Sequence, residues 1–220
     1  MTKSRSRVHQ LFTEAYAKGD YTGWFEKLYA EAQGDLDAIP WADRGVNHWL
    51  VDWVEKSQLD LQDRRVLVVG CGLGDDAEYL AQLGAKVTAF DLSQTAIDWC
   101  HQRFPHSQVN YQAVNLFTAP ADWKLNFDLV IEIYTIQALP ANIRPNEIDA
   151  IGNFVAPNGE LLVICRGRNS EDPCENLPFP LTQDELNRFT TTGLTQVSFE
   201  DFIDPVESGS PRRFRIVYQR

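Results

Sequence analysis

The sequence has few of the residues that build metal centres and disulfide frameworks, with four cysteines and four histidines in 220 residues. The cysteines lack C-x-x-C spacing, and no two histidines have the spacing that places metal ligands on one helical face. We therefore predict no metal site and interpret the cysteines as free thiols in a reducing compartment. The residues concerned are Cys71, Cys100, Cys165, Cys174, His9, His48, His101 and His106.

Long apolar runs are also absent. No stretch approaches the ~20 apolar residues that span a bilayer, and the basic N-terminus, MTKSRSRVHQ, is not followed by the apolar segment of a secretory signal. We therefore expect a cytoplasmic protein. Lys and Arg number 20 against 31 Asp and Glu, and the resulting net charge of −11 would repel nucleic acid and anionic membrane surfaces. The expected partner is a small molecule, and the sequence does not indicate an oligomeric state.

The chain has the length of one domain, which we divide into an N-terminal helical extension and a core. Residues 8–33 show helical periodicity, broken at Gly19 and Asp20, and residues 46–54 place apolar side chains at helical spacing. These patterns predict two or three helices within residues 1–57. We expect this extension to act as a lid on a core domain formed by residues 58–220.

From residue 65 onward, predicted strands and helices alternate, which is typical of a parallel sheet with helices on both faces. We predict strands at 65–69, 86–90, 108–114, 127–133 and 159–165, and helices near 75–83, 93–103 and 145–153. A helix over 181–193 begins with a capping box formed by Thr182 and Glu185. Two alternating segments, 194–204 and 212–220, then predict an antiparallel hairpin. The predicted fold class is α/β, a Rossmann-like sheet of five parallel strands plus this C-terminal hairpin.

The stretch VLVVGCGLGDD, residues 66–76, reads as a buried strand, a glycine turn and the start of a helix. Such a turn directs backbone N–H groups toward a nucleotide-like ligand at the carboxyl end of the strand. The dinucleotide fingerprint needs a third glycine at position 75, where this chain has Asp75, followed by Asp76. Because two carboxylates would repel a pyrophosphate, the turn favours a ligand with a positive group and no phosphate, such as the amino acid end of S-adenosylmethionine.

A second strand, VTAFDLS over residues 87–93, leads to Asp91, 21 residues beyond Gly70. At this distance an acidic side chain accepts hydrogen bonds from both hydroxyls of a ribose. The turn and Asp91 together predict a nucleoside cofactor. The alternative is structural: the glycines form a tight connection, and Asp91 caps the following helix.

From Trp41 to about Leu181, the chain resembles the thiopurine and thiol or halide methyltransferase branch of the class I S-adenosylmethionine-dependent methyltransferases. The resemblance is carried by IPWADRG at 39–45, the glycine turn, VTAFDLS followed by Ala96-Ile97, and FDLVIEIYTIQALP at 127–140 followed by Arg144-Pro145. The last match is the most specific of these. The resemblance as a whole implies the seven-stranded fold of that superfamily. It also implies methyl transfer from S-adenosylmethionine to a small molecule, with S-adenosylhomocysteine as product.

The resemblance also implies site residues. Tyr134 and Arg144 lie at the acceptor end, where Arg144 would attract an anionic thiolate. Asn115 replaces an acidic residue that contacts adenine in the family, although its amide oxygen can still accept a hydrogen bond. The implied cofactor-binding residues are Trp41, Gly70, Cys71, Gly72, Gly74, Asp76, Asp91, Leu92, Ser93, Asn115, Leu116, Glu132 and Ile133.

A thiol is already partly ionised at neutral pH and needs less base catalysis than an alcohol or amine. The resemblance implies a thiol or another soft nucleophile as acceptor, and this chemistry is consistent with it. Several alternatives stay open. Glu132 could be a solvated carboxylate at the end of a strand, and Arg144 could be an ordinary surface arginine. The protein as a whole could be an O- or N-methyltransferase of the same fold, or a module that binds the cofactor without catalysis.

Overall fold

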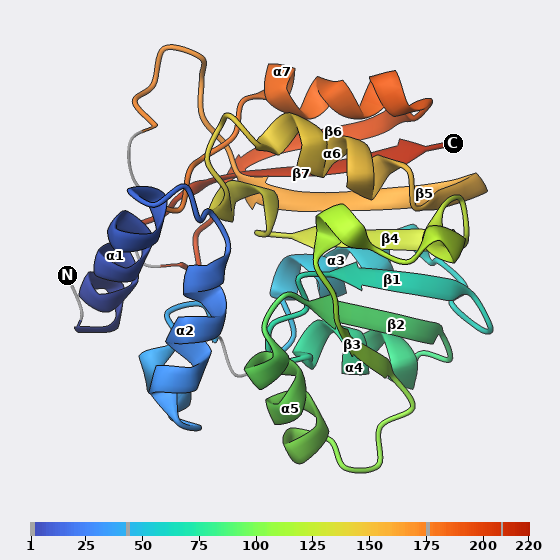
Figure 1. The fold of residues 1–220 in the computed structure, drawn as a ribbon. Helices are drawn as coiled ribbons and strands as arrows, with labels where there is room; N and C mark the ends of the chain where they lie inside the picture. The colour runs from blue at the N-terminus through green and yellow to red at the C-terminus, as the bar shows by residue number, and fades with distance from the viewer. Residues whose placement is uncertain (1–2, 43–44, 175–176, 208) are drawn as a thin grey trace. The chain divides into compact units, whose positions relative to one another are not determined.

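The computed structural model describes residues 3–42, 45–174, 177–207 and 209–220 (Figure 1). Its strands form a seven-stranded sheet in the order β3-β2-β1-β4-β5-β7-β6. Strands β1 and β4, β2 and β3, and β4 and β5 pair in parallel, whereas β7 is antiparallel to both β5 and β6. The predicted fold class is therefore confirmed. The strands are β1 (Arg65–Val69), β2 (Lys86–Asp91), β3 (Asn110–Ala113), β4 (Phe127–Ile133), β5 (Val155–Arg166), β6 (Thr195–Ile203) and β7 (Arg212–Gln219).

The three helices predicted between residues 75 and 153 begin and end within one residue of their predicted bounds. The α-helices are α1 (Lys3–Tyr16), α2 (Gly23–Ala32), α3 (His48–Ser57), α4 (Asp75–Gln82), α5 (Gln94–Arg103), α6 (Arg144–Gly152) and α7 (Gln183–Leu186). Short 3-10 helices are η1 (Leu36–Ala38), η2 (Leu116–Thr118), η3 (Ala121–Trp123), η4 (Ile136–Ala138) and η5 (Asn187–Thr192). Within the described ranges, no helix is both long and apolar enough to cross a membrane.

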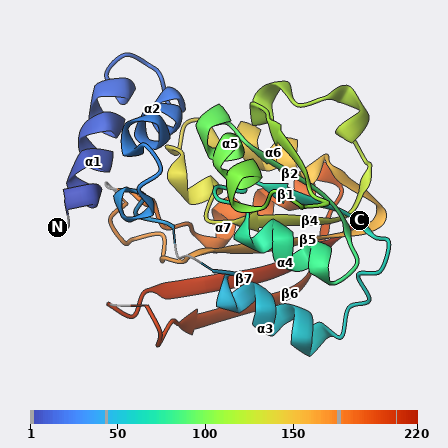
Figure 2. The same cartoon turned by 90° about the horizontal axis from the view of Figure 1, so that it is seen from below.

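The chain divides into two compact units, and the first comprises residues 1–63 and 70–115. In this unit α1 and α2 lie side by side (Figures 1 and 2). Asn47 caps α3 by accepting hydrogen bonds from the N–H groups of Trp49 and Leu50, and the helix then buries Leu50, Trp53 and Val54. The apolar spacing in residues 46–54 therefore marks a helix that packs into this unit.

A carboxylate on α2 joins the N-terminal helices to the start of α5. Glu26 accepts hydrogen bonds from Ser93 Oγ at 2.6 Å, Thr95 Oγ1 at 2.6 Å and the Thr95 N–H at 3.1 Å. These donors lie directly after Asp91, the last residue of β2. The N-terminal extension is thus attached beside one of the predicted cofactor residues.

The second unit comprises residues 64–69 and 116–220. Its centre is β4 and β5, whose middle residues, Leu129 to Ile131 and Leu161 to Cys165, are fully buried. Near-continuous apolar runs of this kind are expected for strands covered on both faces. Helix α6 packs against η5, and both lie to one side of β5 (Figure 1).

The helix predicted over residues 181–193 is shorter than expected. The capping box is confirmed, because Thr182 and Glu185 bond each other's backbone N–H groups, but α7 ends at Leu186 and a 3-10 helix follows. The hydroxyls of Thr190, Thr191 and Thr192 each donate to the carbonyl three residues earlier. Three successive β-branched side chains that bond the preceding turn disfavour the α-helix, which explains the tighter geometry.

Candidate functional site

The glycine turn has a left-handed backbone at each of its glycines. Gly70, Gly72 and Gly74 have φ values of 58°, 52° and 86°, a region that glycine enters without the Cβ penalty of other residues. At Gly74 packing adds a second requirement, because an added Cβ would lie 2.5 Å from Tyr111 Oη. Gly74 also precedes α4 as its N-cap residue. The turn therefore has the strand, turn and helix order that the sequence predicts.

Asp91 is bonded to the turn itself. Its Oδ2 accepts the Gly72 N–H at 3.0 Å, and its Oδ1 accepts the Ser93 N–H at 2.9 Å. Burial raises the pKa of Asp91, and these backbone donors oppose the increase. Helix α5 is capped by Ser93, whose Oγ accepts the Ala96 N–H at 3.0 Å. The alternative that Asp91 caps this helix is therefore wrong, because its carboxylate instead links the turn to the end of β2.

The two acidic residues after the turn have protein partners. Asp75 makes two hydrogen bonds of 2.8 Å with the guanidinium of Arg103. Asp76 Oδ1 accepts the Asn47 N–H at 2.7 Å and so ties the first turn of α4 to the start of α3.

Asp43 and Arg44, which belong to the IPWADRG motif, lie outside the described residues.

An aromatic group from the N-terminal segment lies next to the glycine turn. The Trp41 Nε1–H donates to Tyr29 Oη at 2.8 Å, and that hydroxyl is 3.4 Å from where a Cβ on Gly72 would be. Burial raises the pKa of Tyr29, with a further contribution from the charge of Asp91. Trp41 was predicted from the sequence as a site residue, whereas Tyr29 was not. The helical periodicity around Tyr29 indicated only a core position, and contact with the turn depends on the folded arrangement.

In the second unit, Glu132 is fully buried near the end of β4. Its Oε1 accepts the N–H groups of Thr135 at 2.7 Å and Ile136 at 2.9 Å. Its Oε2 has no hydrogen-bond partner among the described residues. Burial raises the pKa of Glu132 to about 7, although the two N–H donors oppose the increase. The alternative of a solvated strand-end carboxylate is therefore wrong.

Tyr134 directly follows β4 and has a left-handed backbone, with a φ of 64°. Such a conformation is strained for a bulky residue, and strained residues concentrate at functional sites. The guanidinium carbon of Arg213 lies 4.8 Å from the centre of the Tyr134 ring. Arg213 is 2% exposed and bonds Asp204 and Glu207. Its Nη1 has no hydrogen-bond partner within the part of the chain that is described.

Arg213 was not predicted as a site residue, because it lies in an alternating strand pattern where every second residue is polar. Of the other predicted residues, Cys71, Leu92, Asn115, Leu116 and Ile133 are partly exposed, and Ser93 is buried. Trp41 is 37% exposed. The pKa of the Cys71 thiol is raised by the neighbouring Cys100 thiol and by desolvation.

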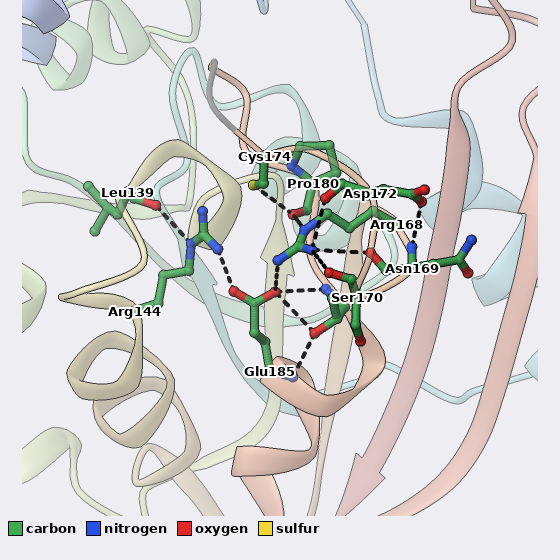
Figure 3. Close-up of polar contacts among 10 residues, drawn as sticks. Leu139, Arg144, Arg168, Asn169, Ser170, Asp172, Cys174, Pro180 and Glu185 are labelled. Atoms are coloured by element: carbon green, nitrogen blue, oxygen red, sulfur yellow. Dashed lines mark hydrogen bonds and ion pairs between the residues drawn. The ribbon is translucent and has the colours of Figure 1, made fainter.

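Arg144 begins α6 and is 2% exposed (Figure 3). Its Nη1 donates to Glu185 Oε1 at 2.5 Å, and its Nε donates to the Leu139 carbonyl at 2.9 Å. The Phe179 ring lies 5.3 Å from the guanidinium carbon. Arg144 is therefore not a surface arginine. Its orientation is set by a carboxylate from α7 and a carbonyl that follows η4.

Comparisons with known proteins give consistent results. The model of the thiopurine S-methyltransferase family matches residues 24–215. A ubiquinone biosynthesis O-methyltransferase from Bordetella avium (strain 197N) is 29% identical over 76% of this chain and 68% of its own length. A probable thiol methyltransferase 2 from Arabidopsis thaliana is 26% identical over 74% of this chain and 68% of its own. The fold is similar to that of the N-methyltransferase NodS from Bradyrhizobium japonicum WM9, solved with S-adenosylhomocysteine, with a TM-score of 0.67, 19% identity and coverage of 88% of this chain and 98% of that one.

Proposed function

The chain belongs to the thiopurine S-methyltransferase family and is an S-adenosylmethionine-dependent enzyme that methylates small molecules, and we propose that its acceptor is a thiol or another soft nucleophile that reacts as an anion. The observation that carries this proposal is the buried guanidinium of Arg213, which lies against Tyr134 with one nitrogen unpaired among the described residues. A guanidinium with an unused N–H in a dry environment is a strong donor to an anion.

The residues around the glycine turn fit the nucleoside part of the cofactor. Glycines with positive φ keep the turn free of side chains, and the Asp91 carboxylate retains acceptor capacity for ribose hydroxyls beyond its two backbone bonds. S-adenosylmethionine supplies a methyl group on a positively charged sulfur. We propose that it is held by the residues named from the sequence: Trp41, Gly70, Cys71, Gly72, Gly74, Asp76, Asp91, Leu92, Ser93, Asn115, Leu116, Glu132 and Ile133. Tyr29 is added to this set because its hydroxyl lies at Gly72.

At the acceptor end, the carboxylates that bond Arg213 are themselves held by guanidinium groups. Arg166 and Arg213 both bond Glu207, and Arg213 also bonds Asp204. These ion pairs offset the repulsion that the two carboxylates would exert on an added anion. We propose that Tyr134 and Arg144 contact the acceptor, with Arg213 as a further contact. These residues would orient the nucleophile and exclude water, which an in-line displacement requires.

We further propose that residues 1–57 act as a lid on the core formed by residues 58–220. The bonds of Glu26 with Ser93 and Thr95 support this role, as does the contact of Tyr29 with the glycine turn. A cytoplasmic location belongs to the same proposal, and the free thiols of the four cysteines support it.

The experiment compares matched aromatic acceptors. Thiophenol, phenol and aniline are each incubated with the protein and S-adenosylmethionine, with iodide as a further arm, and S-adenosylhomocysteine is measured by mass spectrometry. We expect thiophenol to react fastest. Faster reaction of phenol would instead support an O-methyl acceptor, which the name of the Bordetella avium relative also suggests. Tight binding of S-adenosylhomocysteine without turnover of any acceptor would indicate a cofactor-binding module.

A further inference from the structure

Glu185 lies between two arginines that come from different segments of the chain (Figure 3). Its Oε1 accepts from Arg144 at 2.5 Å, and its Oε2 accepts from Arg168 at 3.2 Å. The Thr182 N–H and hydroxyl bond Oε2 at 2.8 Å and 3.1 Å. Burial alone would raise the pKa of Glu185, but the Thr182 N–H and Arg144 outweigh burial, and the pKa lies below its usual range. Glu185 is therefore a fixed, ionised partner of Arg144.

Arg168 stabilises this arrangement from the far side. Its guanidinium donates to the carbonyls of Pro180, Asn169 and Ser170 at 2.9, 3.1 and 3.3 Å, in addition to its contact with Glu185. Five N–H groups in a planar fork can make several such bonds at once. Arg168 therefore has little freedom to move, and Glu185 has little freedom to turn away from Arg144.

A second carboxylate lies close to Arg144. Glu147 is one helical turn further along α6, so both side chains lie on the same helical face. Glu147 is fully buried, and neither of its oxygens has a hydrogen-bond partner among the described residues. Burial and the nearby Glu132 raise the pKa of Glu147, while the charge of Arg144 opposes this increase. Glu147 is thus a potential partner of Arg144 that Arg144 does not bond.

We propose that Glu185 is a positioning residue, which holds the Arg144 guanidinium toward the methyl acceptor and away from Glu147. The inference rests on the proposed function in one respect, the contact of Arg144 with the acceptor. Without the carboxylate at position 185, Arg144 would turn toward Glu147, because a buried arginine that has lost its ion-pair partner and a buried carboxylate without one attract each other strongly. The acceptor would then lose one of its two proposed cations and keep Arg213, while the glycine turn would be unaffected.

The kinetic test uses thiophenol as acceptor and compares the wild type with E185A, E185Q, E147Q and E185A/E147Q. We expect E185A to raise the KM for thiophenol about tenfold, the loss typical of one charge-assisted contact, with an unchanged Kd for S-adenosylhomocysteine. E185Q keeps one acceptor oxygen, so its KM for thiophenol should lie between those of the wild type and E185A. Removing the competing carboxylate in E185A/E147Q should recover most of the lost affinity. An unchanged KM in E185A, or a double variant no better than E185A, would overturn the proposal.

T182A is the matched control, because it removes the side-chain half of the capping box and leaves the carboxylate of Glu185 on Arg144. We expect T182A to lower the Tm with an unchanged KM for thiophenol. If T182A raises the KM as much as E185A does, the effect of Glu185 is loss of the helix cap, and positioning is refuted.

A thermal experiment tests the same inference without any acceptor. At alkaline pH, where the unpartnered buried carboxyl of Glu147 must ionise, E147Q in the otherwise wild-type protein removes this cost and should raise the Tm by about 3 °C. In the E185A background, the same change removes the new partner of Arg144 and should lower the Tm. An increase in both backgrounds would refute the positioning role. If no thiol is methylated but E147Q raises the Tm of the wild type and lowers that of E185A, the thiol proposal is wrong and the positioning of Arg144 by Glu185 stands.

Discussion

Glu132→Gln should make the protein more stable at alkaline pH. Burial raises the pKa of Glu132 to about 7, against a reference value of 4.5 in the unfolded chain. Below pH 4.5 the carboxyl is protonated in both states and costs nothing. Between 4.5 and 7 the native state binds more protons than the unfolded state, so the free energy of unfolding falls as the pH rises. Above pH 7 the loss is complete, at about 3 kcal/mol by the conversion of 1.36 kcal/mol per pH unit.

The glutamine variant lacks this loss and retains an oxygen that can accept from Thr135 and Ile136, the donors that Glu132 bonds. Urea unfolding followed by tryptophan fluorescence at several values between pH 4.5 and 9 gives both free energies. Their difference should grow from near zero to about 3 kcal/mol in favour of the variant and level off above pH 7. A difference between the two free energies of unfolding that stays constant with pH would refute the reasoning. A wild type that becomes more stable relative to the variant as the pH rises would also refute it.

Three further predictions concern the cofactor, the acceptor and the lid. Asp91→Ala should weaken S-adenosylhomocysteine binding by ~1.5 to 3 kcal/mol, because a charged acceptor is lost; wild-type affinity in calorimetry would remove Asp91 from the site. Arg213→Lys keeps the charge but loses the planar fork, so the KM for thiophenol should rise about tenfold, and unchanged kinetics would contradict this contact. Glu26→Ala should destabilise the protein by about 2 kcal/mol and speed proteolysis of α1 and α2. The control Glu31→Ala, which breaks only the exposed pair with Arg7, should cost less than about 1 kcal/mol.

The elements of the core could be predicted because their signals are local. Strands β1 and β4 have the bounds that their apolar runs indicate, whereas α4 and α5 differ from prediction by one residue at one end and α6 by one residue at each end. Burial on both faces favours a near-continuous run of apolar residues in a strand, so the run itself marks the element. Strand β3 is three residues shorter than predicted, and among the strands β5 differs most from its prediction. It begins at Val155, four residues before the predicted start, because Phe127 pairs with Val155 across an irregularity that no local pattern reveals.

The candidate site was predictable where it coincides with a turn. Gly70, Gly72 and Gly74 are needed for positive φ, and Asp91 follows at a spacing set by one strand, turn and helix unit. Tyr29 and Arg213 were missed for the same reason as each other. Each lies in a helix or strand whose periodic pattern commonly contains that type of residue, so the pattern gives no functional signal. Each gains its proposed role from a residue far away in the sequence, which is Gly72 for Tyr29 and Tyr134 for Arg213.

The sequence by itself thus determined the order of strands and helices, the glycine turn and the family, since these depend on residues close together in the chain. Only the tertiary structure decided which charges are paired and which are buried alone. Arg144 and Glu185 are 41 residues apart and form an ion pair, whereas Glu147, one helical turn from Arg144, is left without a hydrogen-bond partner among the described residues. The energy of a charge depends on its distance from water and from other charges, and folding sets both distances.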